Sequence, residues 1–316
     1  MIRKVHFKNF RCLRDVELTL EPLTVLVGPN SSGKTSVLEG LRPLSYDVPD
    51  FWRHDLTQHI SIEWRYQDDT TRKITFGRSE LPNSINAKRR QIQLGSHPTH
   101  KVQSLSLDLP TLRSENTLMV ASRLNRTGDN LTNVFASLTR QQQSAVAKEL
   151  CRLVPMFSDV DLQPTMEGRH RLRFQDRWNP DLWLAPKQVS DGTMLLLAFI
   201  VLQHQDPTPE LITIEEPERA LHPYLLDELI QMLRKMSTGE IGKKAVQVVL
   251  ATHSAELLEY VRPEEVRFLT RSHEDGSVRV NQAATDTPNW RRVYETYNQS
   301  LGGIWLSGGL GGVPGA

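Results

Sequence analysis

Residues Leu23–Val27, LTVLV, lead directly into Gly28–Thr35, GPNSSGKT, and these two stretches determine the fold class. The first stretch is almost continuously apolar, which is typical of a buried central strand. The second matches the pattern G-x-x-x-x-G-K-[ST] of a phosphate-binding loop. A helix is expected next, over Lys34–Leu41. A buried strand, a glycine-rich loop and a helix in this order predict an α/β fold built around a bound phosphate group.

The chemistry of such a loop comes largely from its backbone. Its N–H groups converge on phosphate oxygens, and the start of the following helix adds partial positive charge. Lys34 would neutralise the β- and γ-phosphates, and Thr35 would offer its hydroxyl to Mg²⁺. We therefore expect ATP and Mg²⁺ as ligands. The residues expected to bind the nucleotide here are Gly28, Asn30, Ser31, Ser32, Gly33, Lys34, Thr35 and Ser36.

Two adjacent glutamates follow another apolar stretch, Leu211–Ile214. In a phosphate-loop fold, one acidic residue at such a strand end reaches the Mg²⁺ shell, and a second can activate the attacking water. We assign Glu215 to the metal and Glu216 to the water. Taken alone, a Glu-Glu sequence is more often a solvated turn; the strand before it and the phosphate loop favour the catalytic interpretation.

His253 occupies a similar position, after the apolar stretch Val246–Ala251 and before a helix that begins near Ser254. A histidine there could sense the γ-phosphate or hold the attacking water. A lone histidine is usually structural or exposed, but its place after a second apolar strand favours a catalytic role.

The overall composition is that of an ordinary globular chain. Of its 316 residues 38% are hydrophobic. The net charge of +1 creates no overall electrostatic attraction to nucleic acid or to an anionic membrane. The two cysteines, Cys12 and Cys151, argue against a disulfide framework or a zinc site. The longest apolar run, Met194–Leu202, is too short to span a bilayer. We expect a cytoplasmic protein without a membrane partner.

The order of elements indicates one α/β domain over 1–316 with an insertion. Strand-like alternation runs from about residue 59 to 109, and helical patterns follow to about residue 157. After Ser190, helices and strands alternate, which predicts a mostly parallel sheet. We assign 1–110 and 187–316 to the nucleotide-binding lobe and 111–186 to an inserted helical lobe.

Four motifs together resemble a known group of proteins. They are Asn9–Arg11 (NFR), Gly28–Thr35, Ile214–Pro223 (IEEPERALHP) and Ala251–Leu258 (ATHSAELL). The chain resembles the ABC-type ATPase heads of SMC, RecF and OLD proteins, and more closely the compact bacterial AAA-family ATPases without a coiled coil or a Toprim domain. The resemblance implies ATPase activity and a P-loop NTPase fold with ABC-ATPase-head topology. That fold is α/β, with a mixed sheet flanked by helices, an antiparallel β portion and a small helical insertion lobe.

In this family two heads dimerise around two ATP molecules, and a signature loop of one head caps the γ-phosphate on the other. The stretch Lys187–Ile200, KQVSDGTMLLLAFI, holds the corresponding position. The resemblance thus adds Arg11, Ser190 and Gly192 to the expected nucleotide-binding residues. Asp191 departs from the usual glycine, and we assign it no phosphate contact.

Two further departures concern the metal site and the Q-loop. Glu215 replaces the usual aspartate, which still leaves a carboxylate able to bind a metal. Gln58 is a weak candidate for the Q-loop.

A second signature-like stretch, LSGGL, lies at Leu306–Leu310. It comes after every predicted strand of the nucleotide site, and no apolar run follows it to form a helix. We therefore exclude it as a signature loop. Trp305 and Leu306 indicate either a packed terminus or a docking strip for a partner.

The resemblance leaves the biological role open. We expect a nucleotide-gated homodimeric switch that controls a separately encoded effector, such as a Toprim-like nuclease, in bacterial anti-phage defence. The alternatives are a RecF-like DNA-binding ATPase in repair and a nucleotide-gated scaffold with negligible turnover. DNA is retained as a candidate partner because of Lys88–Arg90 and the alternating Arg169, Arg171 and Arg173, although such arginines more often form a solvated face.

Overall fold

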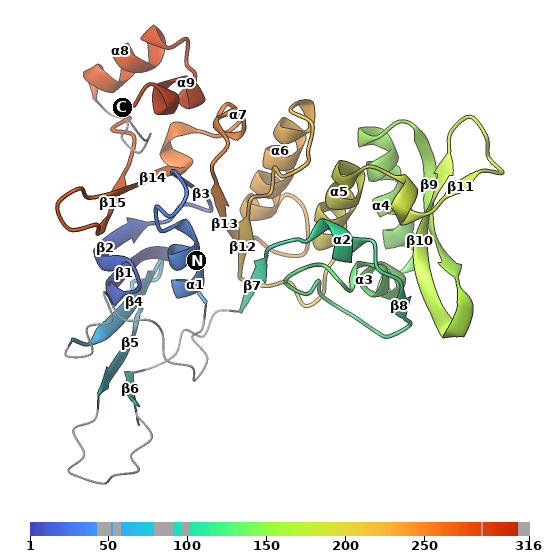
Figure 1. The fold of residues 1–316 in the computed structure, drawn as a ribbon, viewed down its shortest axis with the longest axis horizontal. Helices are drawn as coiled ribbons and strands as arrows, with labels where there is room; N and C mark the ends of the chain where they lie inside the picture. The colour runs from blue at the N-terminus through green and yellow to red at the C-terminus, as the bar shows by residue number, and fades with distance from the viewer. Residues whose placement is uncertain (43–51, 53–57, 79–90, 96–100, 286, 309–316) are drawn as a thin grey trace. The chain divides into compact units, whose positions relative to one another are not determined.

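The computed structural model describes residues 1–42, 52, 58–78, 91–95, 101–285 and 287–308 (Figure 1). The chain forms two compact units. Unit 1 comprises Met1–Val102, Glu210–Ile214 and Gln247–Ala316, and unit 2 comprises Gln103–Pro209 and Glu215–Val246. Unit 2 is larger than the lobe expected at 111–186, because it also includes residues 103–110, 187–209 and 215–246.

Unit 1 contains an antiparallel sheet in the order β2-β1-β4-β5-β6. Its strands are β1 (Ile2–Phe10), β2 (Leu13–Thr19), β4 (Ile60–Tyr66), β5 (Thr71–Arg78) and β6 (Gln91–Gly95). Alternation of apolar residues places Val5 and Phe7 on the buried face of β1, and Ile62 and Trp64 on that of β4. The antiparallel portion expected from the sequence is therefore present.

The second sheet has the order β15-β14-β3-β13-β12-β7. Its strands are β3 (Leu23–Val27), β7 (Val102–Leu105), β12 (Leu211–Glu215), β13 (Gln247–Thr252), β14 (Val266–Arg271) and β15 (Val278–Asn281). Strands β13 and β14 run parallel to β3, and β15 runs antiparallel to β14. Every residue of β3 and β13 is buried, as expected for central strands. The sheet is mixed, which confirms the predicted fold class.

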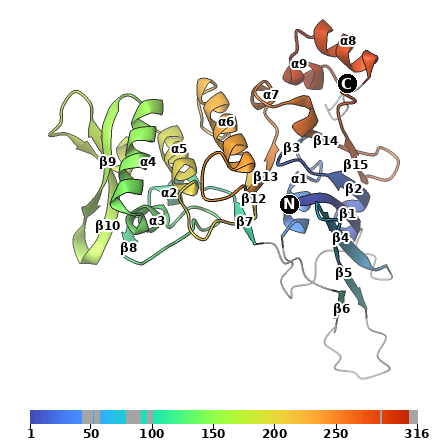
Figure 2. The ribbon, with the colours of Figure 1, turned by 180° about the vertical axis from the view of Figure 1, so that it is seen from behind.

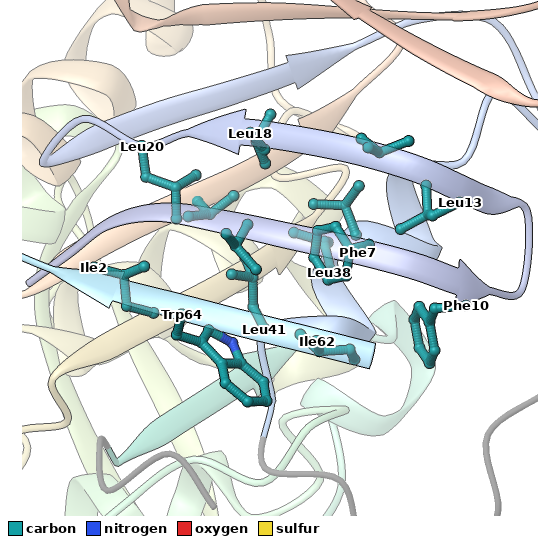
Figure 3. Close-up of a cluster of buried hydrophobic side chains, with 14 of the residues drawn as sticks. Ile2, Phe7, Phe10, Leu13, Leu18, Leu20, Leu38, Leu41, Ile62 and Trp64 are labelled. Atoms are coloured by element: carbon teal, nitrogen blue, oxygen red, sulfur yellow. The ribbon is translucent and has the colours of Figure 1, made fainter. Parts of the chain in front are cut away.

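Helix α1 (Lys34–Gly40) shares one hydrophobic core with both sheets of unit 1. Leu38 on α1 and Leu41 just after it lie among buried side chains of β1, β2 and β4 (Figure 3). A Cβ at Gly40 would lie 2.4 Å from the ring of Phe7, so glycine lets the helix approach the strand closely. This packing holds the helix that begins at the phosphate loop in place.

Unit 2 combines helices with a β ribbon (Figure 2). The helices are α2 (Leu109–Leu112), α3 (Leu131–Ser137), α4 (Arg140–Leu153), α5 (Asp191–Leu202) and α6 (Tyr224–Thr238). The ribbon pairs β9 (Phe157–Pro164) with β10 (Arg169–Asp176), and β8 (Asn116–Thr117) and β11 (Trp183–Leu184) add to β10. Residues 192–202 of α5 are all buried, and α4 packs against both α5 and β9. The insertion is thus part helix and part sheet.

The C-terminal segment of unit 1 forms α7 (Ala255–Leu258), α8 (Pro288–Thr296) and α9 (Leu301–Leu306). The carboxylate of Glu259 accepts bonds from Gly302 N at 3.0 Å and Ser300 Oγ at 2.7 Å, and a Cβ at Gly302 would lie 2.4 Å from Ala255 O. Trp305 is 6% exposed and Leu306 is 59% exposed. The described part of the tail is therefore a packed helix.

Among the helices that the structure describes, none combines the length and the apolar character needed to cross a membrane.

Candidate functional site

The phosphate loop begins where the parallel strands β3 and β13 end, next to β14. Val27, the last residue of β3, is in register with Thr252 at the end of β13 and with Phe268 on β14. The carboxyl ends of neighbouring parallel strands meet at one edge of the sheet. Gly28 directly follows β3 and His253 directly follows β13, so both residues lie at this edge. The structure thus brings together the phosphate loop and the predicted catalytic histidine.

The glycines of the loop are required by its packing. A Cβ at Gly28 would lie 2.4 Å from Leu269 O and 2.7 Å from Ser32 Oγ. Gly33 has a φ of +107°, and a Cβ there would lie 2.7 Å from the side chain of Val278. Larger residues would displace the loop from β14 and β15.

Two polar side chains point into this loop. Lys34 Nζ donates to Gly28 O at 2.7 Å and to Pro29 O at 2.9 Å, which holds the ammonium group over the loop. Ser32 is 1% exposed, and its Oγ has no hydrogen-bond partner among the residues that the structure describes. A buried polar atom without a partner costs about 1–3 kcal/mol. A phosphate oxygen would satisfy it, so the loop fits the nucleotide predicted for it.

The structure adds Arg271, which the sequence analysis missed. Its Nε donates to Ser31 O at 2.8 Å and its Nη1 donates to Gly276 O at 2.6 Å, so the side chain braces the phosphate loop from the end of β14. Its position at the end of the strand-like stretch Val266–Arg271 was the available signal. On the opposite flank, Cys12 Sγ lies 3.3 Å from Ser36 Oγ.

Arg11 lies in the turn between β1 and β2 with a φ of 51°. It forms an ion pair with Glu39 on α1, and its guanidinium lies 5.8 Å from the ring centre of Phe10. The residue is thus fixed on the helix that follows the phosphate loop. Its predicted contact with the nucleotide stays a prediction.

His253 is exposed at the end of β13, and its neighbours fix the backbone around it. Ser254 N donates to Thr252 Oγ1 at 2.9 Å, and Ser254 Oγ accepts from Leu257 N at 3.1 Å, which caps α7. Gln58, the weak Q-loop candidate, is also exposed.

The glutamates predicted for the metal (Glu215) and for the attacking water (Glu216) differ in their backbone. Glu215 ends β12, and its Oε1 lies 3.8 Å from Arg126 Nη2. Glu216 has a φ of 46°, a left-handed conformation that costs a non-glycine residue about 1–3 kcal/mol. Such strain clusters at functional sites, so it supports the choice of Glu216 as a candidate.

Ser190 and Gly192 lie at the start of α5, as the signature position requires. Ser190 is the N-cap: its Oγ accepts from Thr193 N at 3.1 Å. A Cβ at Gly192 would lie 2.8 Å from Ala220 O, so glycine allows α5 to approach the turn after β12. Asp191, between them, forms an ion pair with Arg113.

The predicted residues fall into two groups. The phosphate loop, Arg11 and His253 lie in unit 1, and the two glutamates, Ser190 and Gly192 lie in unit 2. Within the described ranges, no group of three or more His, Cys, Asp or Glu side chains could hold a metal ion.

Two of the three alternating candidate arginines, Arg171 and Arg173, have partners within unit 2. Arg173 donates to Asp161 at 2.6 Å and lies 4.1 Å from the ring centre of Trp183. Burial alone would raise the pKa of Asp161, but the hydrogen bond from Arg173 lowers it below its usual value. Arg171 donates to Gln163 at 3.0 Å. Lys88–Arg90 lie outside the described residues.

A family described as "AAA domain, putative AbiEii toxin, Type IV TA system" matches residues 43–259. The match includes the two glutamates, His253 and Ser190, and it begins after the phosphate loop.

Two curated relatives match over most of the chain. An OLD nuclease of Thermus scotoductus is 25% identical over 87% of this chain and 63% of its own length. The uncharacterized protein YbjD of Escherichia coli is 23% identical over 93% of this chain and 66% of its own length. The chain thus spans less than two thirds of the length of either relative.

Solved structures of SMC heads share the fold. An SMC head bound to the C-winged helix domain of ScpA has a TM-score of 0.56 at 13% identity, and the match covers 89% of this chain and 97% of that one. An SMC head with an extended coiled coil, bound to the C-terminal domain of ScpA from Pyrococcus furiosus, has a TM-score of 0.57 at 11% identity, with 94% and 99% covered. The predicted ABC-head topology is confirmed.

Proposed function

The chain belongs to this AAA-domain family, and on that premise we propose that it binds ATP with Mg²⁺ and hydrolyses it. The observation that carries the proposal is the buried hydroxyl of Ser32, which lacks a partner among the described residues, in a loop closed over by Lys34. This combination fits a phosphate group better than it fits a solvated turn.

Each candidate residue has a role in this proposal. Lys34 neutralises the β- and γ-phosphates, and Thr35 and Glu215 hold Mg²⁺, which when bound offsets negative charge on the phosphates. Glu216 orients and deprotonates the attacking water, and His253 senses the γ-phosphate. The strained backbone of Glu216 supports its assignment to the reacting end of the site.

We further propose that the active form is a homodimer with ATP at the interface. Ser190 and Gly192 of one copy cap the γ-phosphate held by the other copy. The exposure of Ser190 and its place at the N-terminus of the buried helix α5 support this assignment, since N–H groups at such an end attract anions.

ATP turnover by purified protein tests the first proposal. Lys34→Ala should abolish ATP binding, whereas Glu216→Gln should retain binding and lower turnover by at least about a hundredfold. Arg123→Gln is the matched control. It removes a hydrogen bond from the Arg123 guanidinium to Pro207 O in unit 2, at residues to which no role in the site is assigned. Full turnover by the Lys34 variant would refute the assignment, and negligible turnover by the wild type with intact ATP binding would favour the scaffold alternative.

The partner of this switch is the finer proposal. Similarity to an OLD nuclease supports a link to nuclease chemistry, and we propose that the switch controls a separate nuclease-like effector in anti-phage defence. The RecF-like alternative predicts DNA affinity that falls steeply with salt. The ion pairs of Arg171 and Arg173 with acidic residues weigh against it.

A further inference from the structure

Asp191 places a carboxylate where the predicted site needs to receive a phosphate. It is the first residue of α5, directly after the N-cap Ser190, and its side chain is 51% exposed. A negative side chain stabilises a helix N-terminus. The same charge repels an anion brought to that end, because contact between like charges is unfavourable.

Arg113 compensates this charge. Its side chain is 16% exposed; Nη2 donates to Asp191 Oδ1 at 2.5 Å, and Nη1 donates to the carbonyl oxygen of Pro186. One guanidinium group thus contacts both ends of the segment 186–191. The planar group with its fixed set of donors is suited to such a double contact.

The backbone that carries Arg113 is itself well anchored. Arg113 is the C-cap of α2, whose N-cap Asp108 accepts from Thr111 N at 3.2 Å. Leu112 is 1% exposed, and α2 packs against α5. The guanidinium therefore reaches Asp191 from a short helix that packs against α5.

We propose that Arg113 is a positioning residue of the nucleotide-capping site. It neutralises Asp191, so that Ser190 and Gly192 present an uncharged N-terminus to the γ-phosphate held by a second copy. Asp191, paired with Arg113, stands at the position where the resemblance leads one to expect a neutral glycine. This inference rests on the proposed ATP-dependent dimer.

The test is a double-mutant cycle on ATP-dependent dimerisation, measured by analytical ultracentrifugation of the full chain. Arg113→Gln should weaken dimerisation in ATP by about tenfold or more, because Asp191 is left uncompensated. Asp191→Asn alone should remain within about threefold of wild type. Asp191→Asn combined with Arg113→Gln should return dimerisation to within about threefold of wild type. Arg123→Gln is the control, and thermal unfolding checks that each variant is folded.

Each outcome has one meaning. If Asp191→Asn does not restore the dimerisation that Arg113→Gln weakens, Arg113 acts only through its bond to Pro186 O, and the inference is wrong. An unaffected Arg113→Gln would also overturn it. A wild-type chain that stays monomeric in ATP would overturn the proposed dimer and this inference with it. Dimerisation of the wild type without an effect of Arg113 would refute only the inference.

Discussion

Two stretches of this chain combine serine and glycine, and they lie at opposite ends of their helices. Ser190 is the N-cap of α5, and its Oγ accepts from Thr193 N. Ser307 is the C-cap of α9, and its Oγ donates to Ile304 O at 2.7 Å. N–H groups that can bind phosphate emerge at the N-terminal end of a helix, and carbonyl oxygens emerge at the other. The stretch LSGGL matches the signature letters better, but it begins at the wrong end.

The largest effect should come from the buried side of α9. Trp305→Ala should lower the free energy of unfolding by about 3 kcal/mol, because it empties a site that is 6% exposed. Urea unfolding measures this, with Trp305→Phe as a milder control. ATP affinity of the folded variant should be unchanged; its loss would show that the tail contributes to the nucleotide site.

The two serines should differ in their effect on catalysis. Ser190→Ala should lower ATP turnover by about a hundredfold, comparable to the loss of one donor from a site that stabilises a transition state. Ser307→Ala should leave turnover within about twofold. Steady-state kinetics at saturating ATP compare them. Equal effects of the two changes would remove the distinction between the helix ends.

The two close-packed glycines sharpen the same comparison. Gly192→Ala and Gly302→Ala should each destabilise the protein by about 2 kcal/mol, since the added Cβ meets Ala220 O or Ala255 O. At a temperature where both variants are folded, Gly192→Ala should also lower turnover, and Gly302→Ala should not. A neutral Gly192→Ala would contradict the packing at α5.

The smallest effect is expected away from both helix ends, at Arg173. The pKa of Asp161 is lowered in the folded chain, so the stabilisation is present above the carboxyl's ordinary value of 3.8 and is lost as the pH falls through the folded pKa. Arg173→Gln should cost about 0.5 kcal/mol at neutral pH. That difference should shrink below about pH 4 in urea titrations. A difference that grows in acid would contradict the ion pair.

Local sequence patterns predicted the elements that carry the candidate site. Leu23–Val27 was predicted with the bounds that the structure has, because a continuous apolar run specifies a buried strand. The helix expected over Lys34–Leu41 is observed as α1, Lys34–Gly40.

Contacts distant in sequence could not be predicted in this way. Arg113 and Asp191 are separated by 78 positions, and Arg271 and Ser31 by 240. Their neighbours in the chain carry no sign of the contact, which depends on how the elements pack. Helix α9 was missed because Gly302 and Gly303 are poor helix formers, and packing against α7 stabilises it instead.

The central claim is that Ser190 of one copy completes the ATP site of another, and mixing two inactive variants tests it most directly. Ser190→Ala and Lys34→Ala are combined, and ATP turnover is measured against each variant alone. In a mixed dimer, the intact Lys34 and the intact Ser190 meet at one of the two sites. We predict that the mixture recovers turnover toward about a quarter of wild type, because about half of the dimers are mixed and each has one site. A mixture no more active than its components would contradict the account.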